Sequence, residues 1–150
     1  MKSLIILISI ALTSSTAHSQ NQQVFAKFII KSSKWNNVDV TKRLIEARAE
    51  IIFYYQNDTS MLMSNYHDAT DSQSYGGLYP ANDSGIQLKK NERLFIWQYN
   101  NTYDKVKGFA WVKLIKLNRP IGFALQIIPD NGDRLYYNGN LVGANRFFFD

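Results

Sequence analysis

Outside its first nineteen residues the chain contains one histidine, His67, which could act as a general base. It is followed by Asp68 and Asp71, whose carboxylates are the types of group that orient an imidazole or bind a hard cation. The chain has no G-x-S-x-G nucleophile elbow, and the Asp-x-x-Asp spacing matches no common ion-binding loop. A hydrolase acting through His67 and these loop carboxylates is therefore the alternative functional hypothesis, and not the preferred one.

The remaining candidates for catalysis and metal binding have simpler explanations. The chain contains no cysteine, which removes thiol nucleophiles, Cys-ligated metals and disulfides. Of its three glutamates, Glu46 and Glu50 flank Arg48 and are typical of an exposed charged stripe. The sequence nominates no pair of carboxylates facing each other across a cleft, as glycoside hydrolysis requires. We therefore predict a non-catalytic protein with no metal and no cofactor.

A binding site is suggested instead by large amphipathic rings in the C-terminal half. If the hairpins there are symmetric about their turns, Trp97 lies opposite Trp111, Lys113 lies opposite Gln126, and Gln126 lies opposite Tyr137. Rings interrupted by a charge and an amide suit a surface that meets a ligand. The predicted ligand-binding residues are Trp97, Trp111, Lys113, Gln126 and Tyr137. The expected partner is a small apolar ligand, a glycan or a protein; the competing interpretation is a second core layer.

These residues need strands to position them, and the sequence after residue 20 is mostly of period two. Residues 24–33, 47–56 and 61–66 read as strands, followed by a meander over 93–100, 108–117, 122–129 and 133–138. Asn131-Gly132 is typical of a type I′ hairpin turn. About seven antiparallel strands predict an all-β domain, and we favour a small antiparallel barrel over a β-sandwich because closure removes exposed edges.

Two segments leave alternatives open. Residues 41–46 fit a helix as well as a strand, because Leu, Glu and Arg all favour helix. Residues 67–91 are polar and read as one long connection, within which 75–79 forms at most a short strand.

The meander also predicts the core. The face opposite the aromatic one is almost purely aliphatic, as a dry core is. Its members are Leu94, Ile96, Val112, Leu114, Phe123, Leu125 and Ile127.

The first nineteen residues have the order of a Sec signal peptide. Lys2 precedes an apolar run over residues 4–12, and Ala17-His18-Ser19 is a small-x-small site ahead of Gln20. So short an apolar run is a poor membrane span. We expect cleavage near Ser19-Gln20, a single β domain over residues 20–150, and a secreted or periplasmic location.

The 17 basic residues give a formal net charge of +5 but are scattered along the chain. Such scatter is typical of a solvated surface, so nucleic acid is not an expected partner. The Lys- and Asn-rich composition, the signal-like start and the run from Glu50 to Tyr55 resemble small exported β-rich proteins of Bacteroidota with no assigned role. The resemblance implies a bacterial source and transfers no functional residue.

Overall fold

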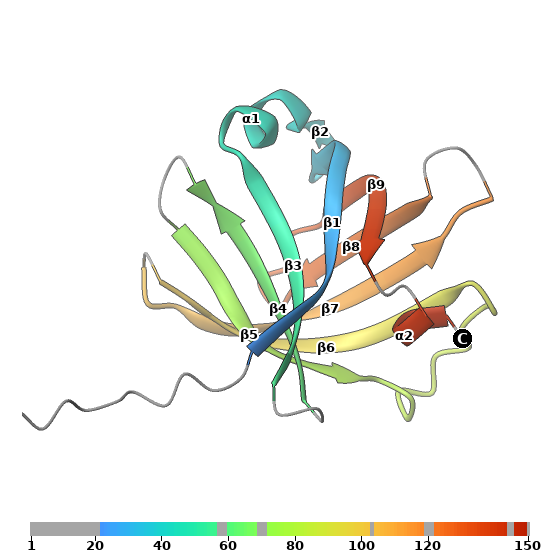
Figure 1. The fold of residues 1–150 in the computed structure, drawn as a ribbon. Helices are drawn as coiled ribbons and strands as arrows, with labels where there is room; N and C mark the ends of the chain where they lie inside the picture. The colour runs from blue at the N-terminus through green and yellow to red at the C-terminus, as the bar shows by residue number, and fades with distance from the viewer. Residues whose placement is uncertain are drawn as a thin grey trace, which may run out of the picture.

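The computed structural model describes residues 22–56, 60–68, 72–102, 104–118, 122–143 and 146–149. The predicted signal peptide lies outside the described residues. The described elements are nine strands and two short helices (Figure 1). In chain order they are β1 (Gln22–Trp35), β2 (Val38–Asp39), α1 (Thr41–Glu46), β3 (Ala49–Gln56), β4 (Ser60–His67), β5 (Ser72–Pro80), β6 (Glu92–Asn101), β7 (Lys107–Lys116), β8 (Phe123–Pro129), β9 (Leu135–Gly143) and α2 (Arg146–Phe149).

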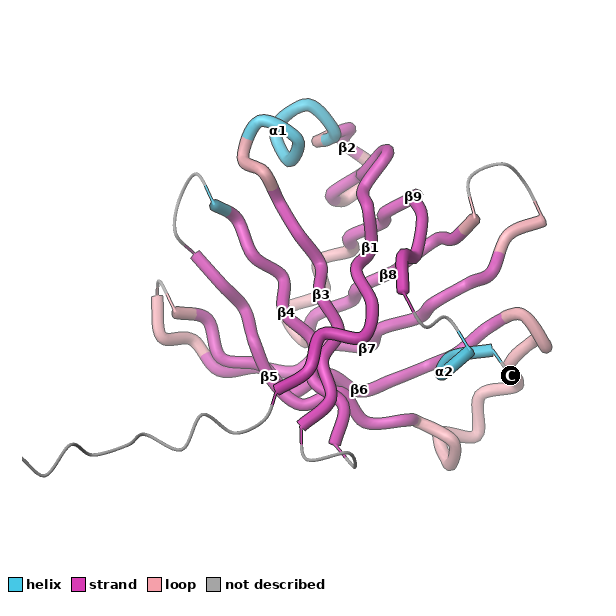
Figure 2. The backbone as a smooth tube through the Cα atoms, viewed as in Figure 1, coloured by secondary structure: helices cyan, strands magenta, loops and turns pink. Residues whose placement is uncertain are grey.

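Eight of these strands close into an antiparallel barrel, and β2 is an additional strand at one end. The order is β2-β1-β3-β4-β5-β6-β7-β8-β9, and β1 also pairs with β9, which completes the circle (Figure 2). The long strand β1 can serve both neighbours because register shifts after Val24 and after Ile30 bend it. The predicted antiparallel barrel is confirmed, with nine strands where the sequence indicated about seven.

The two additional strands are β2, which has only two residues, and β5, which occupies nine residues of the expected 67–91 connection. β9 begins close to its predicted start and runs on to Gly143. The sequence indicated only a short strand over 75–79 in this region, because β5 consists mostly of Ser, Gln, Tyr and Gly. Gly76 is required there: a Cβ at this position would lie 1.7 Å from the backbone oxygen of Gln98 on β6. At Gly76 the backbones of β5 and β6 therefore approach too closely for a side chain to lie between them.

The ambiguous segment over residues 41–46 forms α1. Asp39 accepts a hydrogen bond from the Thr41 backbone N–H at 2.8 Å, and this contact lowers the pKa of the Asp39 carboxyl. Leu44 is buried against the barrel, whereas Ile45 faces solvent. The helix ends where Arg48 adopts a left-handed backbone with φ +49°. None of the helices in the described part of the chain is long and apolar enough to cross a bilayer.

The predicted core is largely buried, but two of its seven members lie on the outer side of the barrel. Val112, Leu114, Leu125 and Ile127 are at most 2% exposed and belong to the barrel core. Ile96 does not: it pairs with Trp111 on the outer surface. Leu94 is buried but also lies on the outer side, opposite Lys113.

The error at Ile96 comes from the register of the β6–β7 hairpin, and the β8–β9 hairpin is displaced in the same way. The β7–β8 register is as predicted, with Lys113 opposite Gln126. Between β6 and β7, however, Trp97 faces Ala110 and not Trp111, and between β8 and β9 Gln126 faces Tyr136 and not Tyr137. A slip of one residue turns each side chain to the opposite face.

The shape of the β8–β9 turn explains why the register between these two strands is displaced by one residue. It is not the predicted two-residue type I′ turn, because only Gly132 has a positive φ, at +86°, while Asn131 does not. Gly132 donates its backbone N–H to the Pro129 oxygen at 3.1 Å, and β9 begins only at Leu135. The connection has an odd number of residues, so the register moves by one.

Candidate functional site

The two ends of the barrel are built differently, and one of them is filled by aromatic rings. This closed end lies next to α2 (Figure 1). Phe148 of α2 is 2% exposed, and its ring centroid lies 5.5 Å from Phe25, 5.2 Å from Phe53 and 5.9 Å from Phe95. Tilted and edge-on ring pairs at these distances are favourable. Phe149 packs beside them against Phe123, so this end has an aromatic plug.

The other end, next to α1, contains a cavity of about 410 Å³. We call it the open end; β4, β6 and β8 finish there and β5, β7 and β9 start there (Figure 1). Its apolar walls are Trp35, Val40, Leu44, Trp97, Ile127 and Leu135. The cavity is also lined by polar side chains, which include Ser33, Asn65, Ser74, Tyr99, Asn101 and Tyr137. The volume is in the range of sites for small molecules.

Two predicted site residues, Trp97 and Tyr137, line this cavity. Trp97 is 3% exposed and donates its indole N–H to the Met63 backbone oxygen at 3.1 Å. Burial raises the pKa of Tyr137 to about 12, and a hydrogen bond with Asn65 acts in the opposite direction. Both rings are thus held in place by polar contacts inside the barrel.

The other three predicted site residues, Trp111, Lys113 and Gln126, lie on the outside of the barrel. The expected single aromatic face therefore does not exist: the register slips place Trp97 and Tyr137 inside and leave Trp111 40% exposed. Lys113 forms an ion pair with Glu92 at 3.0 Å. A hydrogen bond from the Lys89 backbone N–H, together with Lys113, lowers the pKa of the Glu92 carboxyl.

Charged groups gather at the entrance to the cavity. Arg43 comes from α1, and Asp104 and Asp133 come from the connections that follow β6 and β8. Asp133 accepts a hydrogen bond from the Asn36 amide at 2.9 Å, which lowers the pKa of its carboxyl. The entrance is polar, whereas the walls behind it are mostly apolar.

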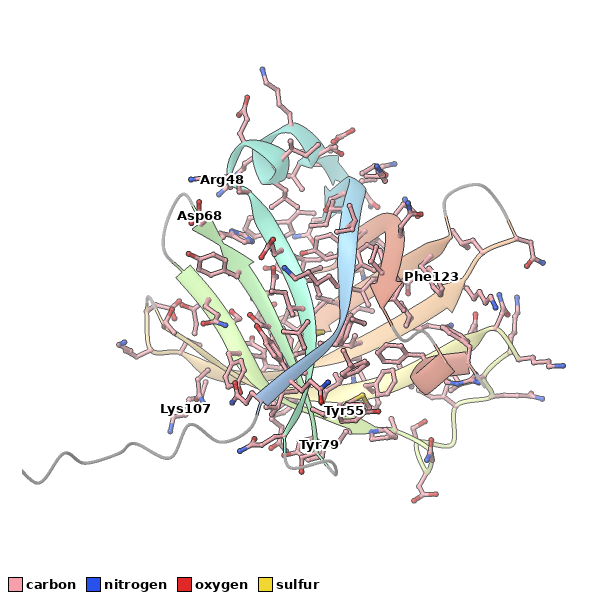
Figure 3. The ribbon with its side chains drawn as sticks, viewed as in Figure 1. Arg48, Tyr55, Asp68, Tyr79, Lys107 and Phe123 are labelled. Atoms are coloured by element: carbon pink, nitrogen blue, oxygen red, sulfur yellow. The ribbon has the colours of Figure 1, made fainter. Side chains whose placement is uncertain are left out.

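His67, the residue of the hydrolase hypothesis, ends β4 and also lines the cavity. Burial lowers the pKa of its imidazole, and the charge of Arg43 lowers it further. Asp68 next to it forms an ion pair with Arg48 and accepts a hydrogen bond from the Tyr66 hydroxyl (Figure 3). Asp71 lies outside the described residues. Within the described ranges no group of three His, Cys, Asp or Glu side chains is placed to hold a metal ion.

Sequence reasoning missed Ser33, Asn65 and Leu135, which come from three different strands. Period-two alternation does place Asn65 on the same side as Met63, but only the barrel topology shows that this side faces β9. Comparison of the chain with protein-family models, with curated proteins and with solved structures finds no match.

Proposed function

We propose that this protein is a non-catalytic binding protein that holds one small, mostly apolar molecule in the open end of its barrel. The observation that carries the proposal is the cavity of about 410 Å³. The interior of an eight-stranded barrel is just wide enough to be filled by side chains or to hold one small ligand. Here the aromatic plug fills one end while the other is left hollow.

The surroundings of the cavity support a small ligand over a protein partner. Trp97, Ile127 and Leu135 line the cavity with apolar side chains. A molecule that enters would be largely surrounded, as ligands in such pockets are. The outer residues Trp111, Lys113 and Gln126 are not needed for this function. The start of the sequence supports export, so we place the binding function outside the cytoplasm.

The proposal is tested by titration with the uncharged fluorescent dye N-phenyl-1-naphthylamine. We expect saturable binding of one dye per chain. Leu135→Trp should fill the cavity and weaken binding at least tenfold. Tyr136→Trp is the matched control, because the neighbouring side chain points outward and pairs with Gln126; it should bind the dye as the unmodified protein does.

Circular dichroism melting of both variants establishes that they are folded. Absence of saturable binding by the unmodified protein would overturn the proposal, whatever the variants do. Equal binding by all three proteins would place the dye elsewhere and would also overturn it.

A hydrolase remains a second candidate because His67 lines the same cavity and its lowered pKa favours a neutral imidazole that can accept a proton. The engagement of Asp68 by Arg48 and Tyr66 makes it a poor orienting partner. His67→Gln separates the two functions: a hydrolase would lose turnover of aryl ester substrates, whereas a binding protein would show none to lose and would keep its affinity for the dye.

A further inference from the structure

The inner end of the cavity is formed by side chains that carry no charge. Tyr137 from β9 is 2% exposed and meets Asn65 from β4, with β1 and β3 between these strands around the barrel. The raised pKa of Tyr137 keeps its phenol protonated at neutral pH. Trp97 and Ser33, both almost completely buried, complete this region. We call these four residues the cavity floor.

Two polar atoms of the cavity floor lack a hydrogen-bond partner among the described residues. They are the Ser33 Oγ and the Asn65 Oδ1. The backbone of Ser33 is engaged by α1 and the residue before it, since its N–H donates to the Thr41 Oγ1 at 2.9 Å and its carbonyl accepts from the Val40 N–H at 3.0 Å. Because the Asn65 Oδ1 is unpartnered, the amide nitrogen makes the contact with Tyr137. Buried polar atoms without partners are rare in native proteins.

These two atoms define which hydrogen-bonding groups a ligand must carry. The Asn65 Oδ1 only accepts hydrogen bonds, so its complement is an N–H or O–H donor. The Ser33 hydroxyl can donate or accept, and it therefore adapts to the same group. A ligand without a donor would leave the Asn65 Oδ1 unpaired and dehydrated, which is unfavourable.

Charge restricts the ligand further. Among the described residues, the charged side chains that line the cavity are Arg43, Asp104 and Asp133, and these belong to the entrance. A carboxylate at the cavity floor would face the Asn65 Oδ1 without a cation, and an ammonium there would lack a carboxylate. Burying an unpaired charge is costly. The buried end of the ligand must accordingly be neutral.

The walls favour a ring over a sugar. The indole N–H of Trp97 is already bonded to Met63, so the part of the ring that borders the cavity is apolar. Ile127 and Leu135 add aliphatic surface. A sugar would bring several hydroxyls against these three side chains, where they find no partner, whereas a flat ring needs none.

We infer that the ligand is an uncharged, flat ring compound of the phenol or N–H heterocycle class, bound with its donor group at the Asn65 Oδ1 and Ser33 Oγ and its ring against Trp97. This inference rests on the proposed function. It assigns Asn65 as the residue that determines specificity and Ser33 as its helper.

Three probes of one shape test the inference: 2-naphthol, 2-methoxynaphthalene and 2-naphthoate, compared at pH 7 by calorimetry. We expect 2-naphthol to bind five- to tenfold more tightly than 2-methoxynaphthalene, and 2-naphthoate to bind most weakly. Asn65→Leu keeps the size of the side chain and removes the acceptor, so it should abolish the preference for 2-naphthol. Gln126→Leu makes the same exchange on the outer surface and should leave the preference intact. Ser33→Ala should reduce it partially.

The outcomes separate the inference from the proposed function. Equal binding of 2-naphthol and 2-methoxynaphthalene, or tightest binding of 2-naphthoate, overturns the inference while the binding function stands. A preference for 2-naphthol that survives Asn65→Leu overturns the assignment of Asn65. Failure of all three probes to bind the unmodified protein overturns both.

Discussion

The closed and open ends of the barrel share one architecture and differ in what their inward positions carry. At the closed end Phe25, Phe53, Phe95 and Phe148 pack ring against ring. At the open end the inward positions of β4 and β5 carry Asn65 and Ser74, which are smaller and polar. Strands hold all of these residues except Phe148, which belongs to α2. The comparison teaches that large rings, one of them supplied by α2, make the barrel solid at one end, whereas smaller inward side chains leave it hollow at the other.

The largest expected effect is on stability, and it separates the two ends. Leu114 is 1% exposed and lies in the closed half, so Leu114→Ala should lower the free energy of unfolding by about 2–5 kcal/mol through a new cavity. Leu135 is half-buried and borders a cavity that already exists. Leu135→Ala should cost about 1 kcal/mol, mainly through lost apolar burial. Urea unfolding measures both, and equal losses would mean that the open end is packed as tightly as the closed end.

A second effect depends on pH and reports on the cavity floor. The pKa of Tyr137 is about 12 in the folded protein and near 10 in the unfolded chain. Between these values the folded state binds more protons, so the stabilisation is fully present below pH 10 and is lost as the pH rises to 12. The loss amounts to roughly 2–3 kcal/mol. The Tyr137→Phe variant should not lose this part of its free energy of unfolding as the pH rises, which unfolding measured from pH 8 to 12 would show.

Other tyrosines with raised pKa values, such as Tyr54 and Tyr99, contribute to the alkaline loss in both proteins. The comparison with Tyr137→Phe removes their contribution. Parallel pH curves for the two proteins would show that the Tyr137 phenol is in contact with water, which contradicts a buried cavity floor.

The smallest expected effect concerns the outer surface. Trp111 is 40% exposed, so Trp111→Phe should change the free energy of unfolding by less than about 1 kcal/mol. It should leave the affinity for N-phenyl-1-naphthylamine unchanged. A tenfold loss of dye binding on this substitution would move the site to the outer face that the sequence first indicated.

The sequence predicted the barrel class well because alternation is a local property. Residues 112, 114, 125 and 127 were recognised as core from period two alone. The grouping of Trp97 with Trp111 failed because it depended on the residue at which the chain reverses, and the β6–β7 connection includes Lys105 in a left-handed conformation. A lysine does not indicate a left-handed turn residue in a sequence, whereas a glycine does.

The cavity itself was not predictable from pattern. Asn65 and Tyr137 are 72 positions apart and meet only because β1 closes the barrel onto β9. Burial of the Asn65 Oδ1 contradicts the usual preference of amides for the surface, and no local signal predicts it. Trp97 and Tyr137 both line the cavity, but they do not share with Trp111 the surface that the sequence had indicated.

The most direct test of a ligand site inside the open end uses the indole N–H signals of the three tryptophans. Trp35 and Trp97 line the cavity, whereas Trp111 lies outside. In ¹H–¹⁵N spectra assigned with the three Trp→Phe variants, titration with 2-naphthol should shift the Trp97 signal saturably, and the Trp35 signal with it. The Trp111 signal should stay in place. A saturable shift of Trp111 with Trp97 unmoved, or no shift of any indole, would contradict the account.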